Sequence, residues 1–140
     1  MTFSTIATIN PWALALGVLA AFLISFVWYA QLFQKPWLRA LGVSAADLED
    51  MQLGKGVPYA VAGITYVVLG FVLALFVGWL DLRSPVEGAL LGILTFSGFN
   101  VTAFVRLVFF EDRPVPLVLI DGGADLITHL VFAILLATWR

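Results

Sequence analysis

Residues 117–136, LVLIDGGADLITHLVFAILL, are apolar enough to cross a membrane, yet they include two aspartates and a histidine. A helix needs roughly 20 mainly apolar residues to span about 30 Å of hydrocarbon. Ionisable side chains within such a helix almost always face the interior of a helical bundle, where a partner or a cavity receives them. The stretch therefore predicts a transmembrane helix with a polar cluster on its inner face.

The composition of the chain points to a membrane as well. Of its 140 residues, 62% are hydrophobic and 11% are charged, which is far from the average of soluble domains. The net charge of −2 comes from seven basic and nine acidic residues without a basic block, so no nucleic acid is expected as a partner. The absence of cysteine excludes disulfides, thiolate metal sites and cysteine nucleophiles.

Four apolar segments have the length of a membrane-spanning helix. The first begins with Asn10 and Pro11, a pair typical of a helix start, because Asn caps free amides and Pro fits the first turn. No charged residue precedes Lys35, so we expect this segment to be retained rather than cleaved as a signal peptide. The chain should form a single transmembrane domain over residues 1–140, an all-α integral membrane four-helix bundle surrounded by the lipid bilayer. The predicted spans are residues 11–33, 57–80, 85–110 and 115–139.

The connection between the first two spans is long enough to carry structure of its own. Ser44 followed by Asp47 resembles a capping box, which predicts a short interfacial helix in AADLEDM, residues 45–51. Trp37, with Lys35 and Arg39 on either side, fits the headgroup region of a bilayer. A plain amphipathic connector would show the same pattern.

The distribution of basic residues predicts the orientation of the bundle. Basic residues near the ends of the spans favour the cytoplasmic side. The first and third connections hold four of them, whereas the opposite side holds two. We therefore expect a cell (inner) membrane protein with both hairpin loops in the cytoplasm and both termini outside. The residues counted are Lys35, Arg39, Lys55 and Arg113 against Arg83 and Arg140.

The first third of the chain resembles a known family. Residues 9–48, INPWALALGVLAAFLISFVWYAQLFQKPWLRALGVSAADL, look like the opening of the DUF1761 family, a group of small, mainly bacterial membrane proteins of unknown function. The resemblance implies a four-helix integral membrane protein without an established activity, and it carries over no catalytic residues. The matching features are Asn10, Trp28, Tyr29, Phe33 and the step from Lys35 to Trp37 before ALG.

The ionisable residues of the fourth span share one face and match polar residues of the third span in depth. Asp121, Asp125 and His129 follow at intervals of four residues, so they lie roughly 9, 15 and 21 Å from the start of that helix. Arg106 and Asn100 lie roughly 6 and 15 Å from the end of the third span. An unpaired charge at the bilayer centre costs at least about 2.5–3.5 kcal/mol. We therefore expect an ion pair between Arg106 and Asp121, with Asn100 level with Asp125.

The third span also carries a small-residue motif. Gly88 and Gly92 form a small-xxx-small contact of the kind that lets two helices approach closely. At 100° per residue the same stripe continues to Phe99 and Arg106, which predicts that Arg106 points into the bundle.

Glycines and aromatic residues flank the polar cluster. Gly122 and Gly123 lie between the two aspartates and allow close helix packing or a local break in the helix. Trp28 and Tyr29 end the first span and, with Trp37, are expected to anchor the chain at the membrane interface.

Two interpretations of the cluster remain open. In one, it forms a polar pocket that opens toward the cytoplasm, with Arg106 as an anion anchor or counter-ion, Asp121 as its partner, and Asp125 and His129 as proton carriers. In the other, the same residues form a structural network that fixes the register of the helices. A metal site is a weak alternative, since Asp-x3-Asp-x3-His finds no further ligand motif on another helix. No metal or cofactor is expected.

Three classes of function are compatible with the sequence. No nucleophile motif, phosphate loop or metalloprotease signature is present, so an enzyme is the least favoured class. The most favoured is an accessory or structural subunit that packs with other membrane helices in a homo-oligomer or a larger membrane protein complex. The alternative is a small, dimeric transporter or proton-conducting protein that uses the Arg/Asp/Asp/His cluster.

Overall fold

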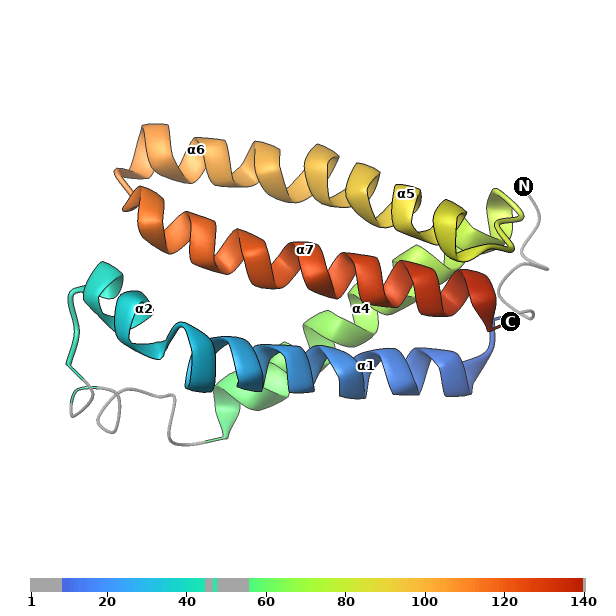
Figure 1. The fold of residues 1–140 in the computed structure, drawn as a ribbon, viewed down its shortest axis with the longest axis horizontal. Coiled ribbons are helices and arrows are strands. Elements are labelled where there is room, and N and C mark those ends of the chain that lie inside the picture. The colour runs from blue at the N-terminus through green and yellow to red at the C-terminus, as the bar shows by residue number, and fades with distance from the viewer. Residues whose placement is uncertain (1–8, 45–46, 48–55, 140) are drawn as a thin grey trace.

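The computed structural model describes residues 9–44, 47 and 56–139, and this part of the chain contains helices and no strand (Figure 1). Four helical segments are long and apolar enough to cross a membrane: Pro11–Leu32, Val57–Trp79, Pro85–Glu111 and Val115–Thr138. Their ends agree with the predicted spans to within one residue. The prediction of an all-α fold with four membrane spans is confirmed.

Two of the four spans contain a π-helical turn. The first span consists of α1 (Pro11–Ser25) and η2 (Phe26–Leu32). The third consists of α5 (Pro85–Thr95), η4 (Phe96–Val101) and α6 (Thr102–Glu111). The second and fourth spans are single α-helices, α4 (Val57–Trp79) and α7 (Val115–Thr138).

Side-chain caps explain where the first and third spans begin. The Oδ1 atom of Asn10 accepts hydrogen bonds from the amides of Trp12 and Ala13 at 2.9 and 3.3 Å. At the start of the third span, Ser84 and Glu87 form a capping box, in which each side chain accepts from the other residue's amide. These contacts satisfy amides that have no partner within the helix.

A short helix follows the first span, at residues for which the sequence analysis predicted none. It is α2 (Gln34–Leu41), which ends at Gly42 in the left-handed region with φ 72°. The predicted helix at residues 45–51 lies outside the described residues apart from Asp47. The capping box at its start is present, because Ser44 and Asp47 each donate a backbone amide to the other's side chain, at 2.7 and 3.2 Å. The hydrogen bonds from Ser44 lower the pKa of Asp47.

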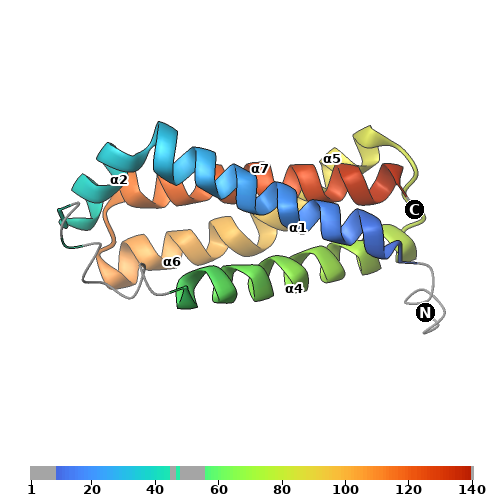
Figure 2. The same cartoon turned by 90° about the horizontal axis from the view of Figure 1, so that it is seen from below.

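The helix α7 lies in the middle of the bundle. It packs against α1, α4 and α5, and α1 also packs against α4. Figure 1 shows α5 and α6 along one side of α7 and α1 along the other, and Figure 2 shows α1 crossing over α7. The start of α1 and the end of α7 lie at one end of the bundle, whereas α2 and the connection from α6 to α7 lie at the other. We call the latter the α2 end.

Two glycines allow α5 to lie directly against α7. A Cβ atom at Gly88 would come within 2.6 Å of the carbonyl oxygen of Ala133, and one at Gly92 within 2.9 Å of that of His129. Real side chains do not approach a backbone so closely, so any larger residue would force the helices apart.

The apolar core fills the half of the bundle that holds the chain ends. Phe132 is 0% exposed and is its largest fully buried side chain, together with Leu73. The ring of Phe132 occupies the space that a Cβ atom at Gly17 or Gly70 would need, at 2.3 and 2.5 Å. Phe132 of α7 therefore packs against both α1 and α4.

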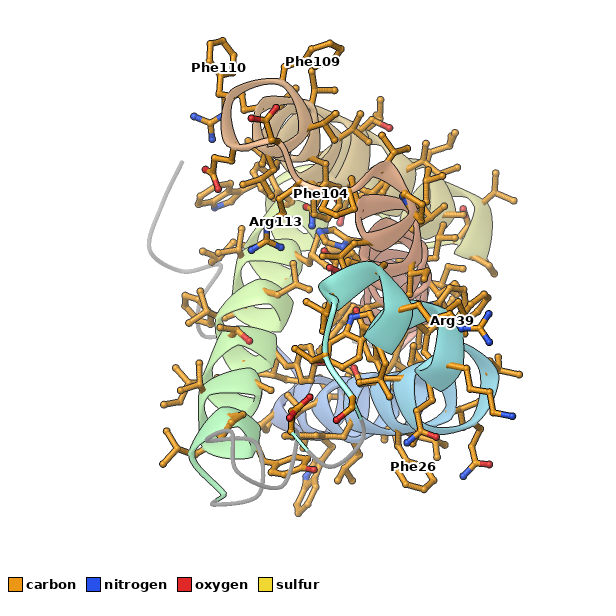
Figure 3. All side chains as sticks on the ribbon, turned by 90° about the vertical axis from the view of Figure 1, so that its left-hand side faces the viewer. Phe26, Arg39, Phe104, Phe109, Phe110 and Arg113 are labelled. Carbon is orange, nitrogen blue, oxygen red and sulfur yellow. The ribbon has the colours of Figure 1, made fainter. Side chains whose placement is uncertain are left out.

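Large apolar side chains cover the outside of the bundle. Phe109 and Phe110 are 77% and 85% exposed, and Figure 3 shows both, like Phe26, pointing away from the other helices. Such exposure would be unfavourable in water, but it is the arrangement expected where lipid is the solvent.

Candidate functional site

The two aspartates of α7 face polar side chains of the first and third spans. Asp121 and Asp125 are both half-buried and lie one helical turn apart. The Oδ1 atom of Asp121 accepts a hydrogen bond from the hydroxyl group of Tyr29 at 3.0 Å and another from the indole nitrogen of Trp37 at 3.2 Å. Segments that are 92 and 84 residues away along the chain therefore meet at one carboxylate oxygen.

Asp125 and His129 continue this site toward the centre of the bundle. The amide group of Asn100 donates to Oδ2 of Asp125 at 2.9 Å. The Nδ1 atom of His129 lies 2.8 Å from the backbone carbonyl oxygen of Asp125, so this nitrogen carries a proton that it donates to the carbonyl. His129 is only 5% exposed, and its ring makes an edge contact with Phe96 at 5.9 Å.

Both π-helical turns lie beside these aspartates. The turn η2 supplies Tyr29, and the turn η4 supplies Asn100 and Phe96. A π turn holds about one more residue than an α-helical turn, is rare in proteins and frequently occurs at functional sites. The first and third spans therefore each depart from α-helical geometry at the residues that bond to the carboxylates.

The close approach of η2 to α7 depends on Gly123. The indole nitrogen of Trp28 donates to the carbonyl oxygen of Ile120 at 2.8 Å. A Cβ atom at Gly123 would lie 2.5 Å from Cζ2 of the same indole. On the other side of α7, a Cβ atom at Gly122 would lie 3.3 Å from the ring of Phe104, a side chain that Figure 3 shows turned toward the interior. The glycines between the aspartates thus face two different helices.

The ion pair predicted between Arg106 and Asp121 is not formed. Arg106 is exposed, and within the described part of the chain the one salt bridge joins Arg83 to Asp81 at 3.0 Å. Arg106 instead lies on the outer side of α6. There it lines a shallow hollow together with Ala103, Leu107, Phe110 and Glu111.

The π turn explains why this prediction was wrong. The predicted stripe assumes an unbroken α-helix from Gly88 to Arg106. Because η4 adds about one residue to a turn, everything after it is rotated by about 100°. Gly88 and Gly92, which precede the turn, are buried, whereas Phe99 within it is 66% exposed and Arg106 after it faces outward.

Neither aspartate forms a salt bridge in the described part of the chain. Asp121 bonds to a phenol and an indole, and Asp125 to an amide. Each carboxylate has a second oxygen, Oδ2 of Asp121 and Oδ1 of Asp125, that accepts no hydrogen bond from the described residues. The arrangement therefore combines donors that stabilise a negative charge with the lack of a counter-ion.

Sequence reasoning placed Tyr29 beside the polar cluster by its depth but missed the role of Trp37. Tyr29 and Trp37 were expected as interfacial anchors, whereas the structure turns their polar atoms toward Asp121. The contact of Tyr29 with Asp121 could be predicted from the antiparallel order of the first and fourth spans. This order places the end of the first span, which holds Tyr29, beside the start of the fourth, which holds Asp121. The contact of Trp37 with Asp121 could not be predicted in this way, because Trp37 reaches Asp121 only through the packing of α2 against α7.

Among the described residues, no group of three or more His, Asp or Glu side chains is placed to hold a metal ion. Another polar contact of the first span is the hydrogen bond between the hydroxyl groups of Ser25 and Tyr66. This bond joins the first span to the second beside the edge contact between Phe22 and Tyr66.

A family model described as "Protein of unknown function (DUF1761)" matches residues 12–137, which is nearly the whole chain. No curated protein and no solved structure matches it.

Proposed function

The chain belongs to the DUF1761 family, and we propose that this member binds and releases protons at Asp121 and Asp125, as the proton-binding part of a small transporter. The observation that carries the proposal is that both carboxylates lie within a membrane span and that no described basic side chain pairs with either. A charge at that depth is costly without a counter-ion. A proton, or a cation in its place, removes that cost.

The hydrogen-bond donors around the site support exchange rather than permanent protonation. Tyr29 and Trp37 donate to Asp121, and Asn100 donates to Asp125. Hydrogen bonds to an ionised acceptor are about twice as strong as bonds to a neutral one. These donors therefore stabilise the charged form of the carboxylates, whereas burial stabilises the neutral form. This combination is the one expected of carboxyl groups that both release and take up a proton.

The arrangement of the core supports access from one side. The aspartates lie in the half of the bundle near the α2 end, roughly 9 and 15 Å from the start of α7. The other half is filled by the apolar cluster around Phe132 and Leu73. We therefore expect protons to reach the aspartates from the α2 end, and transport through the bundle requires a second conformation or a second copy of the chain.

The proposed entrance faces the cytoplasm. This follows from the excess of basic residues in the connections of the α2 end, such as Lys35, Arg39 and Arg113. In this orientation both chain ends lie outside. The proposed location is the cell (inner) membrane.

Infrared difference spectroscopy of the protein in nanodiscs tests the proposal directly. A pH change should produce a carboxyl band that is reduced in Asp121→Asn and in Asp125→Asn. Glu111→Gln, which removes an exposed carboxylate at the end of α6, is the matched control and should leave intact the part of the band that is lost in the two aspartate variants. Equal bands in the wild type and in both aspartate variants would contradict proton binding at this site.

Proton uptake into liposomes tests the transport step. Liposomes that contain the wild type should take up protons when a gradient is imposed, and Asp125→Asn should abolish the uptake without unfolding the protein. The alternative role, an accessory subunit, instead requires that the chain purifies at a fixed ratio with a larger membrane complex. Such a complex, together with liposomes that show no uptake, would favour the accessory role.

A further inference from the structure

The short helix α2 is tied to α7 by few interactions. Within the described residues, the hydrogen bond from Trp37 to Asp121 is the one that joins an α2 side chain to α7. Leu38 is the buried residue of α2, whereas Lys35 and Arg39 are exposed. Figure 3 shows Arg39 pointing away from the bundle. Besides the burial of Leu38 and the ring contacts of Phe33 with Trp28 and of Trp37 with Tyr29, the position of α2 depends on the acceptor oxygen of Asp121.

The π turn η2 connects this helix to the rigid part of the first span. The amide of Phe33 donates to the carbonyl oxygen of Trp28 at 2.8 Å, five residues back. On the other side of the turn, α1 is fixed by Ala13, Gly17 and Ala21, all buried. A change of η2 to α-helical geometry would therefore leave α1 in place and rotate α2 by about 100°.

One carboxylate oxygen holds both η2 and α2. The Oδ1 atom of Asp121 accepts from Tyr29 of η2 and from Trp37 of α2, and the two rings contact each other at 5.5 Å. Because hydrogen bonds to a charged acceptor are about twice as strong as those to a neutral one, loss of the charge on Asp121 weakens both ties at once.

Titratable groups of three helical segments lie around this oxygen. The titratable groups around Asp121 are Tyr29 of η2, Asp125 and His129 of α7, and Tyr66 of α4, which lies near Tyr29. Arg106 of α6 faces outward. Among these groups, Asp121 is the one that accepts the hydrogen bond from Trp37 of α2.

We propose that α2 is a lid over the carboxylates, held closed by the ionised form of Asp121 and released when this residue is neutralised. Release lets η2 return to α-helical geometry, which turns Trp37 away from Asp121 and opens the site at the α2 end. The proposal rests on the proton binding proposed above and adds the movement that this binding controls.

Spin-label distances in nanodiscs test the lid. Because the chain has no cysteine, Arg39→Cys and Phe109→Cys provide two unique labels, one on α2 and one on α6, both at exposed positions. In the otherwise unchanged protein, the distance distribution should change from one population to another between about pH 9 and about pH 3, because carboxyl groups ordinarily titrate near pH 4. A distribution that is the same at both values, in the presence of the infrared carboxyl band, would overturn the lid and leave proton binding intact.

Two variants separate the lid from proton binding. With the labels in place, Asp121→Asn should show the open distribution at every pH, and Asp125→Asn, the matched control, should retain the closed one at high pH. Trp37→Phe removes the tie without changing a charge, so it should populate the open distribution at high pH while the infrared band still titrates. Closed distributions in both Asp121→Asn and Trp37→Phe would overturn the proposal even if Asp121 binds protons.

Discussion

The indole ring of Trp28 occupies the space in which a side chain at Gly123 would lie, since a Cβ atom there would be 2.5 Å from Cζ2 of the ring. The same indole donates to the carbonyl oxygen of Ile120. This contact brings the π turn η2 against α7 at the two aspartates. The geometry of the site therefore requires glycine at position 123.

Gly123→Ala should destabilise the bundle because its methyl group displaces Trp28. Overpacking of this kind costs about 1–3 kcal/mol. The control is Gly98→Ala, because a Cβ atom at Gly98 meets nothing within 4 Å. Thermal unfolding in detergent should show a lower midpoint for the Gly123 variant only. Equal midpoints for the two variants would mean that Trp28 does not pack as described.

Arg106→Gln should leave the stability nearly unchanged, since Arg106 is exposed and makes no salt bridge with Asp121. Surface substitutions change the free energy of unfolding by about 0.5 kcal/mol or less. If the pair existed, removing one partner of a buried salt bridge would cost about 3–5 kcal/mol. Unfolding by denaturant in mixed micelles distinguishes these values. A loss of about 3–5 kcal/mol in the free energy of unfolding would support the ion pair between Arg106 and Asp121 that was predicted from depth.

Phe132→Ala should leave a cavity between α1, α4 and α7. Phenylalanine to alanine changes cost about 3–5 kcal/mol in soluble cores. Part of that cost is transfer from water, which is small in lipid, so we expect the remaining cavity contribution of about 1–3 kcal/mol. Phe110→Ala, at an 85% exposed position, is the control and should have little effect in the same thermal unfolding assay.

The orientation predicts which introduced cysteines react with a reagent that cannot cross the membrane. In intact cells Ser84→Cys, at the end with the chain termini, should be labelled. Arg113→Cys, in the connection between α6 and α7, should be labelled only after the membrane is permeabilised. The opposite result would place the α2 end, and the proposed entrance, outside.

The sequence determined the environment and the number of helices. Apolar stretches of the length needed to cross a bilayer, each started by a proline or a cap, define the four spans to within one residue. These features are local, because every backbone group in a membrane must be satisfied within its own helix. The spacing of Gly88 and Gly92 was sufficient, in the same way, to predict a close helix contact.

The tertiary structure decided which residues surround the aspartates. An unbroken helix would have carried Arg106 inward, whereas the turn η4 rotates it outward and brings Asn100 to Asp125. In the same way, Tyr29 and Trp37 reach Asp121 only through η2 and the folding of α2 onto α7. A π turn has no strong local signature in the sequence, because it is stabilised by contacts with residues far along the chain. Sequence alone thus located the carboxylates within the membrane, and only the packing of the helices showed that they bond to neutral donors rather than to a basic side chain.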